Sequence, residues 1–262
     1  MCSLPNNVEI PDPDVPRVSV VVPALNEEKN LRAAVCSVIE AAKAAGNVTI
    51  EIIIVNDGST DGTAALIEEI KAQCPVVRTI HHERNRGFGA CFLSGLETAE
   101  YERITLFPGD NVISVSTLRN MLRNCIKADL VCAYTVNTEC RSRLRNILSA
   151  VFSFVYASTF NIHLRYINAT PVYPVAPLRA MTLRSRRYSF PSETTVRLLR
   201  GGCSFMEIQG FMNPGARKSS ALRIRNLAEA VLNYLLLVYD VYLRHREEYD
   251  HVPVRVLPED AK

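Results

Sequence analysis

The sequence lacks several features that mark specialised classes of protein. It has no tryptophan, and its eight cysteines form no Cys-x-x-Cys pair and no group with histidines at zinc-site spacing. No uninterrupted apolar run approaches the roughly 20 residues that a membrane-spanning helix needs. The first residues, MCSLPNNVEIPDPDVP, contain neither a basic segment nor an apolar core, so we expect no secretory signal. These absences favour a cytoplasmic protein with reduced thiols, which would meet a membrane only at its surface.

The net charge is also small, but charge is uneven along the chain. The formal net charge is +3, which gives no indication of general nucleic-acid binding. Between Arg141 and Arg225, however, basic residues heavily outnumber acidic ones. This stretch is either a basic surface for an anion such as phosphate, diphosphate or a lipid headgroup, or an ordinary solvated face.

What the first half does contain is a regular alternation of strand and helix patterns. Short β-branched runs alternate with amphipathic helical patterns and end in polar turns. The predicted strands are 18–22, 50–55, 76–81, 103–107 and 129–135, and the predicted helices include 26–45, 63–73 and 116–126. This order predicts an α/β fold with a mostly parallel sheet flanked by helices.

The second half follows a different pattern. Residues 141–164 begin basic and become apolar and aromatic, and a short helix (192–201) and a strand (203–211) follow. A strong amphipathic helix is predicted over 227–246, in which five apolar residues are spaced for burial: Leu232, Leu235, Leu236, Tyr239 and Leu243. Residues 1–16 are expected to form an extended arm and 247–262 a polar, frayed tail.

Polar residues follow three of the predicted strands where each one ends. Pro23 with Asn26-Glu27 follows the first, Asp57 the second, and Pro108-Gly109-Asp110 the fourth. Open α/β sheets bind ligands at the carboxyl ends of their strands, so these residues mark a candidate pocket. A carboxylate held there can accept the N–H of a nucleobase. Alternatively, Asn26 or Glu27 only caps a helix and Asp57 only shapes a turn.

Four motifs in series resemble one family. VVPALNEEKNL, IIIVNDGSTDGT, NRGFGACFLSG and LFPGDN are similar, in order and spacing, to family-2 glycosyltransferases of the GT-A fold. The later segments look most like polyprenyl-phosphate sugar synthases of the dolichol-phosphate-mannose-synthase type. The resemblance implies one GT-A domain over 17–246, with a nucleotide half (17–135) and an acceptor half (136–246). The absence of tryptophan excludes the QxxRW signature of processive polysaccharide synthases.

The resemblance implies a site for a nucleoside-diphosphate sugar. The nucleotide-binding positions that it indicates are Pro23, Leu25, Glu27, Val55, Asp57, Gly87, Pro108 and Gly109. The family's Asp-x-Asp metal motif is Pro108-Gly109-Asp110 here, so Asp110 alone remains to bind Mg²⁺ or Mn²⁺. Either the metal site has fewer ligands than usual, or arginine and lysine neutralise the diphosphate. We favour the first interpretation, because Mg²⁺ keeps several waters in any case.

The acceptor half contains no obvious Glu-Asp pair to act as a general base. A hydroxyl acceptor needs a base, whereas a phosphate is already an anion, so the absence fits a polyprenyl phosphate acceptor. The resemblance implies catalytic roles for Asp110, Arg143, Arg145 and Lys218, and an acceptor-phosphate loop of Arg217, Lys218 and Ser219. The predicted function is inverting sugar transfer from a nucleoside-diphosphate sugar to a polyprenyl phosphate.

Two other functions stay open at this point. One is a soluble family-2 transferase acting on a hydroxyl, with Glu193 as the base; the other is a nucleotide-sugar-binding relative with weak or lost turnover. The apolar segment 147–160 is expected to lie on the cytoplasmic face of a membrane. Its alternatives are a core helix or a dimer interface, so a homo-oligomer is possible.

Overall fold

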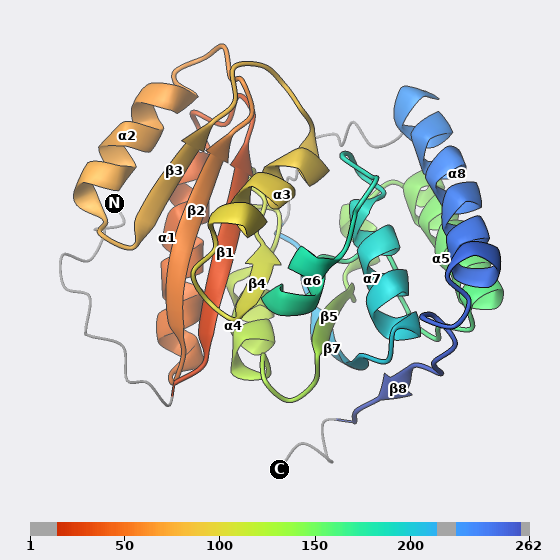
Figure 1. The fold of residues 1–262 in the computed structure, drawn as a ribbon. Helices are drawn as coiled ribbons and strands as arrows, with labels where there is room; N and C mark the ends of the chain where they lie inside the picture. Colours follow the sequence, from red (N-terminus) through yellow and green to blue (C-terminus); the bar gives the residue numbers. More distant parts are fainter. Residues whose placement is uncertain (1–14, 214–223, 258–262) are drawn as a thin grey trace.

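The computed structural model describes residues 15–213 and 224–257 of the chain (Figure 1). The main sheet has five strands in the order β3-β2-β1-β4-β6. Strands β1 to β4 are parallel and β6 runs antiparallel to β4. The strands are β1 (Arg17–Ala24), β2 (Thr49–Asn56), β3 (Val77–His81), β4 (Arg103–Leu106) and β6 (Tyr173–Pro174). A mostly parallel α/β sheet was predicted, and the structure confirms it.

A second, three-stranded sheet lies beside the first. It has the order β5-β7-β8, with parallel pairing between β5 (Leu130–Thr135), β7 (Ser204–Gly210) and β8 (Val254–Arg255). One antiparallel bridge between Val131 and Val172 connects the region of β5 to that of β6. The fifth predicted strand therefore pairs with a strand from the second half of the chain.

Helices cover both faces of the main sheet (Figure 1). The main helices are α1 (Leu31–Ala45), α2 (Thr63–Gln73), α3 (Phe88–Thr98), α4 (Val115–Arg123), α5 (Arg143–Phe160), α6 (Val175–Ala180), α7 (Phe190–Arg200) and α8 (Ile224–Tyr239). Successive side chains of a strand point to opposite faces. Accordingly Val20 and Ile52 pack with α1, α2 and α4, whereas Val21 and Ile53 pack with α3, α6 and α7.

Helix α1 begins five residues later than the first predicted start. Asn26 has a left-handed backbone (φ 57°), which a helix cannot contain. Its N–H donates to Ser59 Oγ (3.0 Å), and the N–H of Glu27 donates to Thr63 Oγ1 (2.9 Å). The segment 25–30 is therefore held as a loop by the β2–α2 turn, and the first full turn forms only at Leu31.

Helices α5 and α8 lie side by side on the side of the molecule away from β3 (Figure 1). The rings of Tyr156 and Tyr234 are 5.2 Å apart, and the Tyr234 hydroxyl lies 2.6 Å from Thr159 Oγ1. The prediction that Leu232, Leu235, Tyr239 and Leu243 are buried is wrong, because they are 57%, 58%, 51% and 72% exposed.

Other residues of the same helix face the core. They are Tyr234, Leu237 and Val238, a second stripe at helical spacing, which Val241 continues in the helical segment Asp240–Arg244 that follows α8. Because α8 is apolar over most of its circumference, its periodicity left undecided which stripe the core would take.

Three further observations concern the tail, the thiols and the length of the helices. The tail was expected to fray, but Tyr249 is buried and the N–H of Val256 bonds to the carbonyl of Phe205 (2.8 Å), so residues up to 257 are anchored. The cysteines of the described residues are free thiols. In the described part of the chain, no helix combines the length and the apolarity needed to cross a bilayer.

Candidate functional site

The loops that follow β1, β2 and β4 meet at one edge of the sheet. The N–H of Asp57 donates to the carbonyl of Ala24 (2.9 Å), and the N–H of Gly109 donates to the carbonyl of Pro23 (3.1 Å). A Cβ added at Gly109 would lie 2.8 Å from that carbonyl oxygen, so glycine permits the close approach. A cavity of about 1080 Å³ opens at this edge.

Most of the residues predicted from the sequence line this cavity. They are Pro23, Leu25, Glu27, Asp57, Gly87, Pro108, Gly109, Asp110 and Arg145. Arg217, Lys218 and Ser219 lie outside the described residues, so their predicted roles stay predictions. Val55 and Arg143 were also predicted to belong to the site, but neither lines the cavity.

Both misplacements have a geometrical cause. Val55 lies in β2 with its side chain in the core beneath α3, because it shares a strand face with Ile53. Arg143 begins α5 and is exposed outside the cavity. Residues two apart on a helix point in different directions, so Arg145 lines the cavity and Arg143 does not. Arg141 reaches the cavity from the extended backbone before α5.

Asp57 is buried at the end of β2 and is held by donors from three segments. Its Oδ1 lies 2.8 Å from His82 Nδ1 and accepts the N–H of Arg86 (2.8 Å), and its Oδ2 accepts the N–H of Gly87 (2.9 Å). The Cys91 thiol also hydrogen-bonds to this carboxylate. Asp57 lines the cavity, so a donor on a ligand there can share its oxygens. The arrangement can hold a nucleobase N–H.

Gly87 makes this arrangement possible. Its backbone is left-handed (φ 102°), which aims its N–H at Asp57, and an added Cβ would lie 2.8 Å from the carbonyl oxygen of Arg186. That same carbonyl accepts the N–H of Ala90 in the first turn of α3 (3.0 Å). The glycine was predicted to allow a close approach, and the approaching group is the loop before α7.

Asp57, His82 and Cys91 also have ligand-type atoms within 4.8 Å of one another. This group fits a metal ion poorly. Two backbone N–H groups and the imidazole already point at the carboxylate, where a cation would have to sit. Burial and the nearby Asp57 charge raise the pKa of the Cys91 thiol, whereas metals bind the thiolate. The group is therefore a hydrogen-bonded anchor.

Asp110 is the better candidate for a metal ligand. It lies after β4 on the cavity wall, and its Oδ1 accepts the N–H of Val112 (3.2 Å). Among the described residues, the other acidic side chains on this wall are Glu27 and Asp57. A carboxylate oxygen is the ligand type that Mg²⁺ and Mn²⁺ prefer, and the single carboxylate leaves room for waters and diphosphate oxygens.

Arg141 and Arg145 line the same cavity as Asp110, and Arg145 is close enough to Asp110 for the two charges to interact. The Arg141 guanidinium lies 5.5 Å from the centre of the Tyr166 ring, and its Nε donates to Met212 Sδ (3.0 Å). Burial and the neighbouring Arg141 charge lower the pKa of Arg145, an effect that nearby tyrosines and Asp110 partly offset. Two like charges in a half-buried site are costly unless an anion joins them, so this part of the cavity could hold an anionic group.

The far end of the cavity is apolar. Its walls there come from α5 and α8, and include Leu144, Leu148, Val151, Val155 and Val231. All five are also exposed to solvent, so the apolar lining is continuous with an apolar outer surface. One cavity thus joins a polar strand edge, a cationic middle and an apolar exit.

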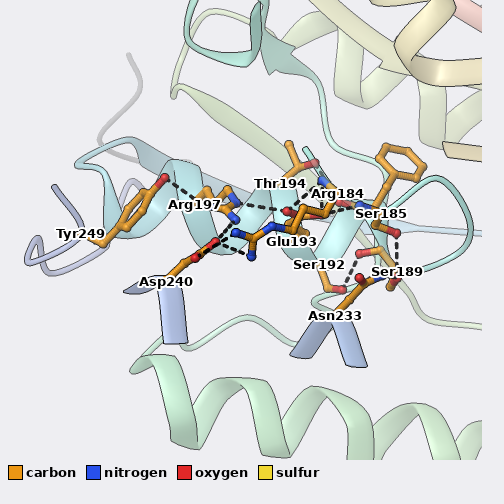
Figure 2. A network of polar contacts seen from close by, with 11 residues as sticks. Arg184, Ser185, Ser189, Ser192, Glu193, Thr194, Arg197, Asn233, Asp240 and Tyr249 are labelled. Atoms are coloured by element: carbon orange, nitrogen blue, oxygen red, sulfur yellow. Dashed lines mark hydrogen bonds and ion pairs between the residues drawn. The ribbon is translucent and has the colours of Figure 1, made fainter. Parts of the chain in front are cut away.

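A buried ionic network supports the loop that carries Arg187 and Tyr188 to the cavity wall (Figure 2). In the middle of α7, Arg197 donates to Asp240 Oδ2 (2.6 Å) and to Glu193 Oε1 (3.2 Å). Arg184 forms a second ion pair with Asp240 (2.7 Å). Burial alone would raise the pKa of Asp240, but the two guanidinium groups hold it below its usual value.

Glu193 belongs to this network. Its carboxylate accepts the backbone N–H groups of Arg184 (3.2 Å) and Ser185 (2.8 Å) besides Arg197 Nε. It is buried and does not line the cavity. A base must reach the proton that it removes, so this geometry argues against Glu193 as a general base.

Comparison with known proteins agrees with this geometry. Residues 19–185 match the family described as "Glycosyl transferase family 2". The chain therefore belongs to glycosyl transferase family 2.

Two curated relatives illustrate the sequence match. The "Succinoglycan biosynthesis protein ExoO" of Rhizobium meliloti is 36% identical over 41% of this chain and 29% of its own length. The "Dolichyl-phosphate beta-glucosyltransferase ALG5D" of Trichomonas vaginalis is 29% identical over 47% of this chain and 41% of its own. The matched part thus spans less than half of each relative.

Solved structures share the fold at low identity. Glucosyl-3-phosphoglycerate synthase from Mycobacterium tuberculosis, in complex with Mg²⁺ and UDP, superposes with a TM-score of 0.63 at 16% identity, over 85% of this chain and 79% of the other. TarS of S. aureus, in complex with UDP-GlcNAc, gives 0.58 at 15% identity, over 87% and 67%. These likenesses confirm the GT-A fold that the motifs predicted.

Several cavity residues were not among the predicted site residues. Arg141 was counted only in the basic stretch, and it reaches the cavity from extended backbone before α5, where helical spacing gives no signal. Tyr166, Arg187 and Tyr188 reach the cavity from loops that carry no motif, so no local signal indicated them.

Proposed function

We propose that this protein transfers a sugar, with inversion, from a nucleoside-diphosphate sugar to a polyprenyl phosphate. One observation carries the proposal: a single cavity joins the nucleotide edge, two arginines and an apolar exit between α5 and α8. Among the described residues, the acidic side chains of this cavity all come from the strand-end loops, namely Glu27, Asp57 and Asp110. A hydroxyl acceptor at the apolar end would lack a base, whereas a phosphate needs none.

The donor lies at the strand edge in this proposal. Asp57 accepts a nucleobase N–H, and Pro23, Leu25 and Glu27 from the β1 loop surround the nucleoside. Both solved relatives described above contain UDP or a UDP-sugar, which supports a uridine donor. The diphosphate then extends past Gly109 toward Asp110.

The transfer takes place in the cationic middle of the cavity. A phosphate oxygen of the acceptor attacks the anomeric carbon from the face opposite the diphosphate, and the bond from that carbon to the diphosphate oxygen breaks. Arg141 and Arg145 stabilise the crowded negative charge. Asp110 would hold Mg²⁺ or Mn²⁺, which when bound supplies positive charge to the departing diphosphate. The predicted contact of Arg217, Lys218 and Ser219 with the acceptor phosphate is kept as part of this proposal.

The acceptor's lipid chain leaves through the apolar exit. Polyprenyl chains are apolar, and the walls of α5 and α8 continue onto exposed side chains such as Phe154 and Leu243. We place these two helices at the headgroup level of the cytoplasmic face of a membrane, as a peripheral contact. The name of the Trichomonas relative, a dolichyl-phosphate glucosyltransferase, supports a lipid phosphate acceptor. Pairing of two copies through the same surface is the alternative.

The decisive experiment is a product assay. The full chain is incubated with a panel of nucleotide sugars, Mg²⁺ or Mn²⁺, and short polyprenyl phosphates, and mass spectrometry reads the products. We expect a polyprenyl-phosphate sugar with phosphate acceptors and no product with the matched polyprenols. Product from an alcohol but not from a phosphate would overturn the proposal and favour the hydroxyl-acceptor function.

Arg145 and Arg143 provide a matched pair of variants for this assay. Arg145→Leu removes a cavity cation, and loss of one charge-stabilising donor costs about 100-fold or more in kcat. Arg143→Leu removes an exposed cation two residues away and should change the rate less than threefold. Equal losses in the two variants would mean that general basicity, and not the cavity geometry, supports the reaction.

A further inference from the structure

His82 lies behind Asp57, at the end of β3, and takes no part in the function proposed above. Its Nδ1 is 2.8 Å from Asp57 Oδ1, and its Nε2 is 2.9 Å from Ser94 Oγ in α3. His82 is buried and does not line the large cavity. Three side chains therefore form a chain of hydrogen bonds that leads from the cavity wall into the protein.

The bonds of this chain fix the position of one proton. An ionised carboxylate only accepts, so the proton lies on Nδ1 of His82 and is donated to Asp57. The Ser94 hydroxyl can either donate to Nε2 or accept from it, so it satisfies the ring in both protonation states. The Nδ1–H donor thus persists whether the imidazole is neutral or charged.

The contact constrains the orientation of the Asp57 carboxylate. The χ2 torsion of aspartate is broad and roughly two-fold, so a carboxylate at a strand end can rotate. His82 and the N–H of Arg86 both bond to Oδ1, whereas the N–H of Gly87 bonds to Oδ2. These donors come from β3's end, a loop and the start of α3, so together they fix the plane of the carboxylate.

We propose that His82 is a positioning residue that sets the nucleobase preference of the donor pocket through Asp57. A fixed, acceptor-only carboxylate binds a base with a ring N–H, such as uracil or guanine. It rejects a base with a bare ring nitrogen, such as cytosine or adenine, because two acceptors then face each other. The inference rests on the proposed function, in which Asp57 contacts the base.

Two isosteric substitutions separate this role from mere packing. The amide nitrogen of Asn in His82→Asn occupies the place of Nδ1 and keeps the bond to Asp57. The amide of Gln in His82→Gln occupies the place of Nε2 and keeps the bond to Ser94 instead. His82→Phe keeps the ring volume and loses both bonds.

The readout is a ratio of dissociation constants measured by calorimetry on the full chain. It is the dissociation constant of the nucleotide with a bare ring nitrogen divided by that of the nucleotide with a ring N–H. UDP is compared with CDP, and GDP with ADP, and the pair that the wild type binds is used for every variant. We expect His82→Phe and His82→Gln to lower the ratio at least tenfold, in line with the loss of a hydrogen bond to a charged group. His82→Asn should keep the ratio within threefold of the wild type.

Other outcomes overturn the inference. A ratio within threefold of the wild type in His82→Phe, or equal ratios in His82→Asn and His82→Gln, would show that His82 only fills space. If the Phe variant does not fold, the Asn and Gln pair still decides. A wild type that binds no nucleotide of either pair would instead refute the proposed function, so the two failures are distinguishable.

Discussion

Replacing Asp240 with alanine should destabilise the fold strongly, although Asp240 lies far along the chain from the sheet. Asp240 is the shared partner of Arg197 and Arg184 (Figure 2). The Arg197 side chain is only 7% exposed, and removing one partner of a buried ion pair costs about 3–5 kcal/mol. Arg184 is 33% exposed and can be rehydrated, and Arg197 keeps Glu193, so we expect the lower end, about 3 kcal/mol.

The measurements are urea unfolding and thermal unfolding of the wild type, of Asp240→Ala and of a control variant. A loss of about 3 kcal/mol lowers the Tm of a chain of this size by about 6–12 °C. The matched control is Asp250→Ala, because Asp250 is 78% exposed and lies 3.9 Å from Arg200, and such surface pairs contribute at most about 1 kcal/mol. Variants that differ by less than 1 kcal/mol would refute the reasoning that burial of the network stabilises the α7 region.

The same contact predicts a dependence on pH. Folding lowers the pKa of Asp240, since two guanidinium groups outweigh the effect of burial. The carboxylate therefore contributes its full stability above the pKa of an unfolded aspartate, about 4, and loses it as the pH falls through the lower folded value. The stability difference between the wild type and Asp240→Asn should shrink below about pH 4. A difference that grows on acidification would contradict this sign.

Two further predictions concern the donor pocket and the outer surface. Asp57→Asn should weaken nucleoside-diphosphate binding tenfold or more in calorimetry, because a charged acceptor that is bonded to three donors is lost; unchanged affinity would mean that Asp57 only shapes the turn. The double variant Phe154→Ser with Leu243→Ser should reduce co-sedimentation with anionic phospholipid vesicles at least fivefold at unchanged Tm, because both side chains are about 72% exposed and contribute to no core. A change in oligomeric state without a change in vesicle binding would favour pairing of two copies instead.

The sequence by itself determined the elements and the strand edge. Strands β1 and β2 are β-branched runs, and helix α2 occupies the predicted residues 63–73, because these patterns depend on neighbours within one element. The polar turns after β1, β2 and β4 were sufficient to bring Pro23, Asp57 and Asp110 to one cavity, since parallel strands end at the same edge.

Only the tertiary structure decided which face each later residue presents. Arg141, and not Arg143, points to the cavity, and Glu193 is bonded to the backbone of a loop instead of facing an acceptor. In α8 the stripe that includes Leu237 is buried and the stripe that includes Leu235 is exposed. Periodicity indicates which residues share a face, but the direction of that face depends on packing against segments far away in the chain.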